Sequence, residues 1–428
     1  MHDFLQSLRE RVLLYDGSKG VMLQMRGLRG DEAAESWNLL KPEVVKDIYR
    51  QYKEAGSDVL QTNTFPGNSI TLGSHGLGDK VAEINAAGVE LAKEVAGRDV
   101  FVAASVGPTG LFLEPVGNLS FEQAYDIYRE QLLALAEAGA DLVNFETFTD
   151  LNELRAAILA ARENTRLPVI ASLTFNKGSK TLSGNPAEVC AIACQALGAA
   201  VVGANCSGGP ESLLEPIKKM SAVAAVPLAV KPNAGLPEIK DGKAIYSQTP
   251  EIFSSYTRDF IASGVRLIGG CCGTTPEHIR ALKKELARIE APEAEIKNIP
   301  AIASAYSYFV CRADARIKQL PLWEKKLADA LTAGDFSEII AAALEGEAER
   351  ADYLLLDFGD MRDFNVWEFT STFSLSVKIP VAVKAGSQDV LAKFLRYYPG
   401  RAGVLLSERK AGSRSICVHY GALILGEE

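Results

Sequence analysis

Cysteine is scarce in this sequence, and basic residues are outnumbered by acidic ones. Seven cysteines among 428 residues are an odd number at low density, which argues against the disulfide framework of a small secreted protein. The 45 lysines and arginines stand against 54 aspartates and glutamates, which gives a net charge of -9. Proteins that bind the phosphate backbone of nucleic acids usually carry the opposite charge, so nucleic acid is not an expected partner.

Long apolar segments are also rare. The one long uncharged stretch, residues 189–210, contains Gln195 and Asn205, and a buried helix followed by a buried strand explains it better than a membrane span. Residues 1–17 include the acidic Glu10 and no apolar core of the length found in signal peptides. We therefore expect a soluble, cytoplasmic protein that does not associate with membranes.

One pattern repeats through the first 290 residues: a short apolar run, then a segment with helical periodicity. The apolar runs are Val12–Asp16, Asp58–Thr64, Val100–Val106, Leu142–Thr147, Val169–Phe175, Ala200–Ser207, Leu228–Asn233 and Arg266–Cys271. The helical segments include Pro42–Ala55, Lys80–Ala96, Phe121–Ala138, Asp150–Asn164, Pro186–Leu197, Pro250–Ser263 and Pro276–Glu290. Near-continuous apolar runs are typical of parallel strands that are buried on both faces. The pattern therefore predicts an α/β fold, a (β/α)8 TIM barrel over residues 1–290.

An open, doubly wound sheet would show the same alternation, but no G-x-G-x-x-G loop follows the first apolar run, so the barrel is preferred. Residues 291–303 contain two prolines and no clear period, and we interpret them as a linker. Residues 304–428 return to the strand–helix pattern with half the units of a barrel, which predicts a smaller C-terminal α/β domain. Its expected helices are Lys318–Ala333, Ser337–Glu349 and Asp389–Tyr397, and its expected strands are Asp352–Asp357, Val381–Lys384 and Gly403–Leu406.

Three cysteines fall at the ends of predicted strands. Cys206 ends the sixth apolar run, and Cys271 and Cys272 end the eighth. Active sites of TIM barrels lie at the carboxyl ends of the strands, so the three sulfur atoms can meet above the barrel. Glycines on both sides of the Cys-Cys pair allow the backbone to bend until both thiols point inward. Three thiolates suit Zn2+, with a fourth tetrahedral position open for solvent or substrate.

Other interpretations of these cysteines stay open. The glycine-rich segment 269–275 could cradle a phosphate after the eighth strand, the adjacent cysteines could form a strained disulfide, or all three thiols could simply be buried. The other four cysteines are interpreted as small residues of the core: Cys190, Cys194, Cys311 and Cys417.

Polar residues follow several further strands. Asp16, Asn63, Glu146 and Asn233 come at the ends of the first, second, fourth and seventh runs. Acidic residues at helix N-termini also serve as dipole caps, and Asp150 is expected to be one. Two carboxylates beside a thiophilic metal would suit a small ligand that carries both an amine and a thiol.

Six motifs stand in order at these strand ends: D-G-S-K-G at 16–20, Q-T-N-T-F at 61–65, F-E-T-F-T-D at 145–150, G-A-N-C-S at 203–207, K-P-N-A-G at 231–235 and G-G-C-C-G-T-T-P at 269–276. Together they resemble the zinc-dependent homocysteine S-methyltransferase family, above all the homocysteine-binding module of cobalamin-dependent methionine synthase. The resemblance implies that Cys206, Cys271 and Cys272 bind zinc and carry the catalysis.

The same resemblance implies a substrate site beside the metal. Asp16 and Glu146 correspond to the carboxylates that hold the amino group of homocysteine in that family. Asn233 occupies a position that can approach the metal when no substrate thiolate is bound. We expect Asn63, of the Q-T-N-T-F motif, to belong to the substrate site as well.

Residues 304–428 resemble more faintly the pterin-binding barrel of methionine synthases, through segments 379–391 and 396–403. The acid or amide positions that such a barrel uses are changed here, to Leu355 and Lys384 with Asp357 nearby, so a folate site is not expected. We expect this region to pack against the barrel, against a second copy of itself in a homo-oligomer, or against a corrinoid protein.

The resemblance implies methyl transfer to the thiolate of homocysteine, which yields methionine. With the pterin-like region altered and no corrinoid-binding domain recognised, we expect the donor to be methylcobalamin supplied by a separate corrinoid protein. S-methylmethionine or a betaine-type donor is the alternative within the same class. A non-catalytic sensor that binds homocysteine or a metal is the alternative from another class, and detectable methyl transfer with any donor would separate the two.

Overall fold

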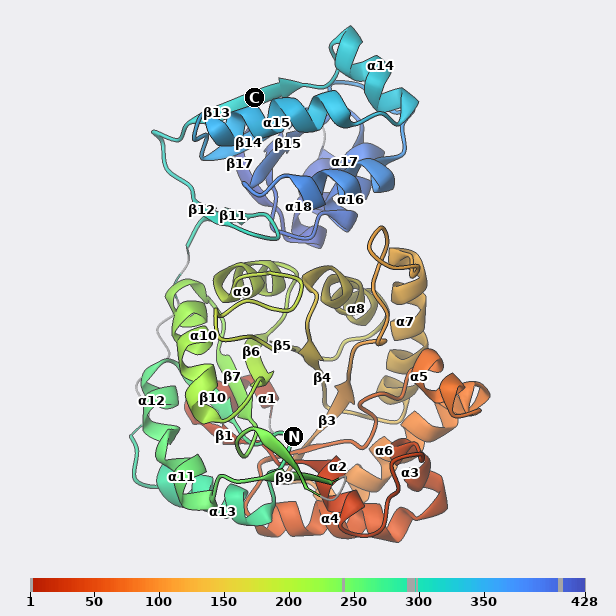
Figure 1. Ribbon diagram of the computed structural model, residues 1–428, viewed down its shortest axis with the longest axis vertical. Coiled ribbons are helices and arrows are strands. Elements are labelled where there is room, and N and C mark those ends of the chain that lie inside the picture. The colour runs from red at the N-terminus through yellow and green to blue at the C-terminus, as the bar shows by residue number, and fades with distance from the viewer. Residues whose placement is uncertain (1–2, 241–242, 291–296, 298, 407–410, 428) are drawn as a thin grey trace.

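The computed structural model describes residues 3–240, 243–290, 297, 299–406 and 411–427, which form two α/β domains (Figure 1). In the larger domain a ring of helices surrounds a set of parallel strands. The smaller domain lies beside this barrel, next to α8 (Leu151–Asn164) and α9 (Ala187–Ala196).

Eight parallel strands form the barrel, in the order β1-β10-β7-β6-β5-β4-β3-β2. Their bounds are β1 Leu13–Leu14, β2 Val59–Gln61, β3 Phe101–Val106, β4 Leu142–Phe148, β5 Val169–Leu173, β6 Val201–Cys206, β7 Leu228–Pro232 and β10 Val265–Ile268. A parallel bridge between Tyr15 and Val59 joins the two ends of the sheet and closes the ring. Each of the eight apolar runs overlaps with one of these strands, so the prediction of a TIM barrel is confirmed.

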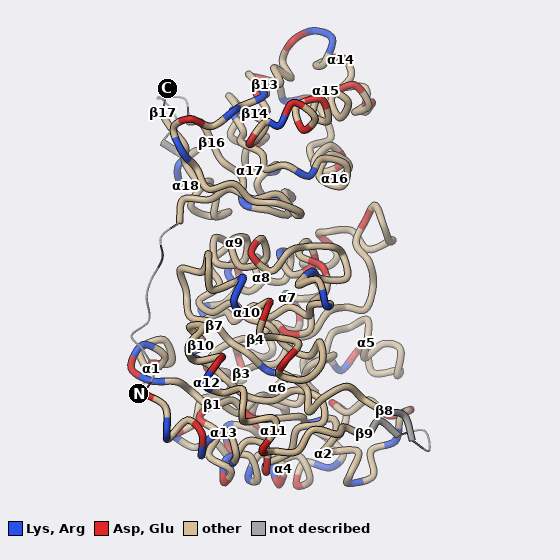
Figure 2. The backbone as a smooth tube through the Cα atoms, turned by 60° about the vertical axis from the view of Figure 1, so that its left-hand side comes forward, with Lys and Arg blue, Asp and Glu red and all other residues tan. Residues whose placement is uncertain are grey.

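The outer ring consists of the longer helices that follow the strands: α4 Pro42–Glu54, α6 Val81–Ala96, α7 Phe121–Glu137, α8, α9, α10 Pro210–Val223, α11 Pro250–Ser255, α12 Thr257–Ala262 and α13 Pro276–Leu286. Shorter elements lie within the loops or before β1: α1 Phe4–Glu10, α2 Lys19–Gln24, η1 Ala34–Ser36, α3 Trp37–Leu40, α5 Ser69–Ser74 and η2 Gly78–Lys80. A hairpin after β7, formed by β8 Pro237–Lys240 and β9 Lys243–Tyr246, projects beyond the barrel helices (Figure 2).

Local sequence explains where several helices begin. Ser120 and Gln123 form a capping box at the start of α7, and Asp150 accepts hydrogen bonds from the backbone of Asn152 and Glu153 at the start of α8. Asp150 is therefore the N-cap that the sequence predicts. At the other end of the barrel, α1 packs Phe4 and Leu8 against apolar residues of the strands, so that end is closed. The open end is the one at which the strands finish.

The uncharged stretch of residues 189–210 forms most of α9, all of β6 and the start of α10. The buried helix and buried strand predicted for it are both found. Among the described residues, no helix has the length and apolar character needed to cross a membrane.

The C-terminal domain contains a five-stranded parallel sheet in the order β13-β14-β15-β16-β17. Its strands are β13 Ile317–Pro321, β14 Tyr353–Asp357, β15 Val381–Lys384, β16 Gly403–Leu406 and β17 Leu423–Glu427, and its helices are α14 Lys325–Ala333, α15 Ser337–Ala348, α16 Val366–Ser376, α17 Gln388–Tyr397 and α18 Ala411–Tyr420. A separate hairpin, β11 Ala301–Ala303 and β12 Tyr308–Val310, precedes the sheet. The prediction of a smaller C-terminal α/β domain is confirmed.

Two details of this domain differ from the sequence-based expectation. Residues 318–321 are not the start of a helix; they belong to the edge strand β13, which pairs with β14, and the helix begins at Lys325. The proposed linker, residues 291–303, ends in β11, while residues 291–296 and 298 lie outside the described residues. In both places the residues form a strand because they pair with a neighbouring strand. Periodicity in the sequence gives no information about such pairing.

The two domains meet through a buried arginine of the barrel. Arg155 on α8 donates hydrogen bonds to the backbone carbonyls of Leu395, Arg396 (2.8 Å) and Gly400 (3.2 Å). Around it, Arg396 pairs with Glu122 at 2.8 Å. Of the three packing partners expected for the C-terminal region, the structure thus contains the first, the barrel itself.

Candidate metal and substrate site

Three thiols meet at the open end of the barrel. Cys206 is the last residue of β6, and Cys271 and Cys272 follow β10 across the intervening strand β7. The Sγ atom of Cys206 lies 3.8 Å from that of Cys272 and 3.7 Å from that of Cys271. Among the described residues this is the one group of three or more Cys, His, Asp or Glu side chains close enough to hold a metal ion.

The spacing of the sulfur atoms fits a tetrahedral zinc site. Zinc–sulfur bonds of about 2.3 Å at tetrahedral angles place neighbouring sulfurs about 3.8 Å apart. The two distances from Cys206 agree with that value, and all three sulfurs lie within 4.8 Å of one another. The donor set and its dimensions therefore suit Zn2+ without rearrangement of the backbone.

Backbone conformation is specialised at both cysteine segments. Cys206 adopts a φ of 58°, in the left-handed region that is costly for a residue other than glycine. Gly273 has a φ of 80°, and a Cβ atom on it would lie 2.2 Å from Cγ of Tyr246. A glycine is therefore required at 273, since it allows the turn and the close packing of the Tyr246 ring.

Hydrogen bonds within the cluster favour one thiolate. Hydrogen bonds to Cys272 from Cys206, from Cys271 and from Tyr246 lower the pKa of the Cys272 thiol, although its burial opposes this. The side-chain amide of Asn205 lies 3.8 Å from the Sγ atom of Cys271 and can donate to it. The pKa values of Cys206 and Cys271 are raised instead, because each is buried beside the other thiols, so the cluster favours a single thiolate.

Asp16, one of the predicted substrate residues, is fully buried at the end of β1. Its Oδ2 atom accepts hydrogen bonds from the Lys19 ammonium group and from the backbone of Gln61 (2.8 Å). Its Oδ1 atom is buried and has no hydrogen-bond partner. Burial raises the pKa of Asp16, and Lys19 and Lys231 oppose that rise.

Glu146, the second predicted carboxylate, lies across the barrel on β4 and is also buried. Its Oε1 atom accepts hydrogen bonds from Ser105 (2.6 Å) and from Gln61, and its Oε2 atom accepts one from Lys231 at 2.9 Å. Lys231 belongs to the K-P-N-A-G motif, but it lies within the strand and was not among the predicted site residues. The structure places it as a buried partner of Glu146 on β7.

The two predicted asparagines differ in their surroundings. Asn233 accepts a hydrogen bond from the backbone N–H of Cys272 at 3.1 Å, so it supports the cysteine pair directly. Asn63 donates instead to the carbonyl of Ala34 (2.8 Å) and to the side chain of Asn38 (3.0 Å). Its side chain therefore fixes the segment that follows β1, and its role toward a substrate stays a prediction.

Several residues of this site were missed because they belong to a barrel strand or to the β8–β9 hairpin, rather than standing just after the end of a barrel strand. They are Gln61, Ser105, Asn205, Lys231 and Tyr246, each of which contacts a predicted site residue. A polar residue inside an otherwise apolar strand is the signal that could have found four of them, because such a residue must find a buried partner. Of the cysteines assigned to the core, Cys190, Cys194 and Cys417 are buried and Cys311 is partly buried.

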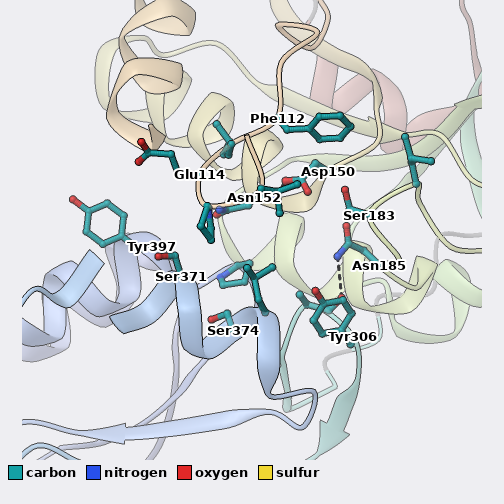
Figure 3. A pocket seen from close by; sticks show the side chains of 17 residues that line it. Phe112, Glu114, Asp150, Asn152, Ser183, Asn185, Tyr306, Ser371, Ser374 and Tyr397 are labelled. Carbon is teal, nitrogen blue, oxygen red and sulfur yellow. Dashed lines mark hydrogen bonds between the residues drawn. The ribbon is translucent and has the colours of Figure 1, made fainter. Parts of the chain in front are cut away.

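A separate cavity of about 430 Å3 lies between the two domains (Figure 3). Asp150 and Asn152 line it from the barrel, and Ser371 and Ser374 face them from α16 of the C-terminal domain. None of the three cysteines borders it. It is therefore a feature of the domain interface and not part of the thiol site.

A family model described as "Homocysteine S-methyltransferase" matches residues 13–286, which cover the whole barrel. The chain belongs to the homocysteine S-methyltransferase family. The match includes Cys206, Cys271 and Cys272 as well as both buried carboxylates, Asp16 and Glu146.

Relatives of this family member include two mycobacterial proteins named methionine synthase. The protein of Mycobacterium tuberculosis is 31% identical over 437 residues, covering 94% of this chain and 36% of the relative. The protein of Mycobacterium leprae is 34% identical over 330 residues, covering 71% of this chain and 27% of the relative. The chain thus spans about a third of the length of these relatives, and the first alignment extends well past the barrel.

Solved structures of the homocysteine methyltransferase MmuM from Escherichia coli share the barrel fold. The metallated form has a TM-score of 0.57 at 24% identity, covering 65% of this chain and 99% of that one. The oxidized form has a TM-score of 0.56 at 25% identity, covering 66% and 99%. The shared part amounts to about two thirds of this chain.

Proposed function

We propose that this chain transfers a methyl group to the thiolate of homocysteine and so forms methionine, with Zn2+ held by Cys206, Cys271 and Cys272. The observation that supports this most is the trio of sulfur atoms at tetrahedral zinc spacing in a barrel of the homocysteine S-methyltransferase family. When bound, zinc would keep the sulfur of the substrate deprotonated at neutral pH, where a free thiol is mostly protonated.

The residues of the chain supply charge and position. Three cysteinates would give a site that holds Zn2+ a net negative charge, which would keep electron density on the sulfur of the substrate. Asn205 supports Cys271, and Asn233 holds the backbone of Cys272. These contacts hold Cys271 and Cys272 in place, and positioning of this kind is a large part of the catalysis of group transfer.

Charged residues beneath the thiols hold the other end of the substrate in this proposal. Asp16 and Glu146 are buried side chains of the same barrel mouth, on β1 and β4, and each is paired with a lysine. An amino acid carries an ammonium and a carboxylate group, so a buried site with side chains of both charges suits it. A thiol without these groups would leave those buried charges without partners.

For the methyl donor, we propose methylcobalamin presented to the mouth by a separate corrinoid protein. Large apolar side chains are exposed on the segments that follow several barrel strands, namely Met25, Leu40, Leu111 and Leu236, whereas the exposed Phe112, Val116 and Leu182 line the cavity between the domains. Exposed apolar groups around one opening are typical of a surface that receives another protein. The names of the mycobacterial relatives agree with a methionine synthase reaction.

An assay of methionine formation tests this proposal. Zinc-loaded protein is mixed with homocysteine and, in separate reactions, with free methylcobalamin, a methylated corrinoid protein, S-methylmethionine or glycine betaine. We expect methionine from the two corrinoid donors only. Methionine from S-methylmethionine or betaine alone would overturn the choice of donor. Retained homocysteine binding without methyl transfer from any donor would favour the non-catalytic sensor.

A further inference from the structure

The cavity between the two domains is large enough for a small molecule. Its volume is about 430 Å3, and small-molecule sites in proteins measure about 300–1,000 Å3. The loop after β3 and the start of α8 form one wall, and α16 forms the opposite wall (Figure 3). The side-chain amide of Asn185 donates to the carbonyl of Ala305 at 3.1 Å and joins the two sides. Because both domains supply walls, the cavity exists only while they are packed together.

The charged side chains that border this cavity are acidic. They are Glu114 and Asp150, and among the described residues no lysine, arginine or histidine lines it. Oδ1 of Asp150 accepts hydrogen bonds from the backbone of Asn152 (2.8 Å) and Glu153 (2.9 Å) at the start of α8. No described residue donates to its Oδ2 or pairs with the carboxylate of Glu114. Carboxylates without a basic partner in a partly enclosed space attract a cation and repel an anion.

Two polar atoms on opposite walls of the cavity have no hydrogen-bond partner. They are Oδ1 of Asn152, on the barrel side, and Oγ of Ser374, on α16 (Figure 3). Both atoms are buried, and Ser374 as a whole is only 8% exposed. A buried oxygen without a donor is destabilising, and most such atoms in folded proteins are paired. A bound molecule with N–H groups would supply the missing donors.

Aromatic and apolar side chains form most of the remaining lining. The large exposed ones are Phe112, Val116, Leu182 and Leu375. Exposed apolar groups around one opening are typical of a surface that receives a ligand. The ring of Tyr306 borders the cavity as well, and the face of an aromatic ring attracts a cation. Burial and the charge of Asp150 raise the pKa of Tyr306, so the carboxylate and the ring act on the same space.

We propose that this cavity binds a small organic cation, a primary ammonium ion attached to an apolar alkyl or aryl group. An ammonium group has three N–H donors, and the lining offers three oxygens for them: Oδ2 of Asp150, Oδ1 of Asn152 and Oγ of Ser374. The apolar group covers the exposed apolar side chains of the lining and removes them from water. None of the three cysteines borders the cavity, so the site is separate from the thiol site and does not depend on the proposed methyl transfer.

Other classes of ligand match this lining less well. An anion, such as a folate with its carboxylates, would meet two acidic side chains and no basic one. A metal ion needs several ligands close together, and among the described residues the cysteine trio is the one such group. A neutral apolar molecule would fill the space but leave the oxygens of Asn152 and Ser374 without donors. The cation is the class that satisfies both the charge and the unpartnered oxygens.

Calorimetry on the full chain tests the class of ligand with three probes that differ in their polar group. They are 4-phenylbutylamine, 4-phenylbutan-1-ol and 4-phenylbutanoate. We expect the amine to bind about 10- to 100-fold more tightly than the alcohol, the range of a charge-assisted hydrogen bond, and the carboxylate to bind most weakly. Equal affinities for the three probes would overturn the proposal. Absence of amine binding at about 1 mM would overturn it as well.

A variant without the two charges tests the location. Asp150→Asn/Glu114→Gln removes both carboxylates, and because asparagine is also a good N-cap, α8 keeps its start. This variant should weaken amine binding about 10- to 100-fold and leave binding of the alcohol unchanged. An amine affinity equal to that of the wild type would overturn the site.

The matched control is Glu83→Gln/Glu90→Gln, which removes two exposed carboxylates of α6, a helix that does not border the cavity. Its amine affinity should equal that of the wild type. A loss as large as in the cavity variant would mean that the net charge of the protein attracts the amine, and it would overturn the site. Homocysteine binding, measured in the same zinc-loaded samples, should be the same in all three proteins. The proposed function and this inference can therefore fail independently.

Discussion

Both domains of this chain are built from the same strand–helix unit, but they differ in the side chains that their strands bury. In the barrel, the strands end in buried charged and polar side chains, including Asp16, Glu146 and Lys231 below the three thiols. In the C-terminal domain, Tyr353 and Leu355 on the corresponding inner face of the sheet belong to an apolar cluster with Ile302 of the β11–β12 hairpin. Among the described residues of that domain, Asp357 is the one buried charged side chain.

This difference shows that the fold alone does not create a site. A parallel sheet offers the carboxyl ends of its strands in either domain, but chemistry needs polar side chains there and space to receive a ligand. In the smaller domain the hairpin packs near the amino ends of the strands, where Ala303 pairs with Arg401, and the residues at the carboxyl ends are Asp357 and Lys384. We therefore place the reaction in the barrel and assign the smaller domain to packing.

The largest effect expected from this comparison concerns the metal. Replacing Cys206, Cys271 or Cys272 by Ala should reduce the zinc content from about one ion per chain to none and abolish methyl transfer, because two thiolates do not complete a zinc site. Metal analysis of protein purified without chelators measures this. Cys311→Ala, in the smaller domain, is the control and should keep its zinc. Wild-type protein free of zinc would refute the assignment.

A second effect concerns folate. Calorimetry with methyltetrahydrofolate should show no binding at micromolar protein, because the pterin ring would find no buried acid or amide at the positions of Leu355 and Lys384. Homocysteine, titrated into the same zinc-loaded sample, should bind and is the positive control. A micromolar dissociation constant for the folate would contradict the contrast between the domains and would restore a folate site to the smaller one.

A third effect concerns the contact between the domains. Arg155→Ala should lower the free energy of unfolding of the paired domains by about 3–5 kcal/mol, since three buried carbonyls lose their donor. Chemical denaturation followed by circular dichroism should then show two separate transitions. Arg166→Ala, at an exposed position before β5, is the control and should leave the unfolding curve unchanged. One unaltered transition in Arg155→Ala would show that the interface does not depend on this arginine.

The sequence predicted the barrel and the cysteine trio well because both depend on local patterns. Eight apolar runs mark eight strands, and a cysteine at a strand end points to the open end of the barrel whatever its neighbours are. It did not predict the Lys231–Glu146 pair, which joins residues 85 positions apart on β7 and β4. It also assigned β13 to a helix, because an edge strand is defined by the neighbour with which it pairs. Periodicity in the sequence does not predict contacts between residues that lie far apart in the chain.

The smallest expected effect is a pH dependence of stability that belongs to the barrel. Burial raises the pKa of Glu35, in the segment after β1, from 4.5 to about 7. Because the folded-state pKa lies above the unfolded one, the protonated form is favoured by folding. Protonated Glu35 therefore contributes about 3 kcal/mol to the free energy of unfolding. This contribution is complete below pH 4.5 and is lost as the pH rises to about 7.

Glu35→Gln should remove that slope, so the difference in stability between pH 4.5 and pH 8 should become smaller by up to about 3 kcal/mol. Trp37 is the one tryptophan of the barrel, and replacing Trp323 and Trp367 by Phe leaves its fluorescence as a report on barrel unfolding alone. The exposed Glu90→Gln is the matched control and should keep the wild-type slope. If stability depends on pH equally in Glu35→Gln and in the wild type, other groups set the pH dependence. If the dependence is lost, burial of a charged group has a measurable cost in stability. Such burial is the property that distinguishes the barrel from the smaller domain.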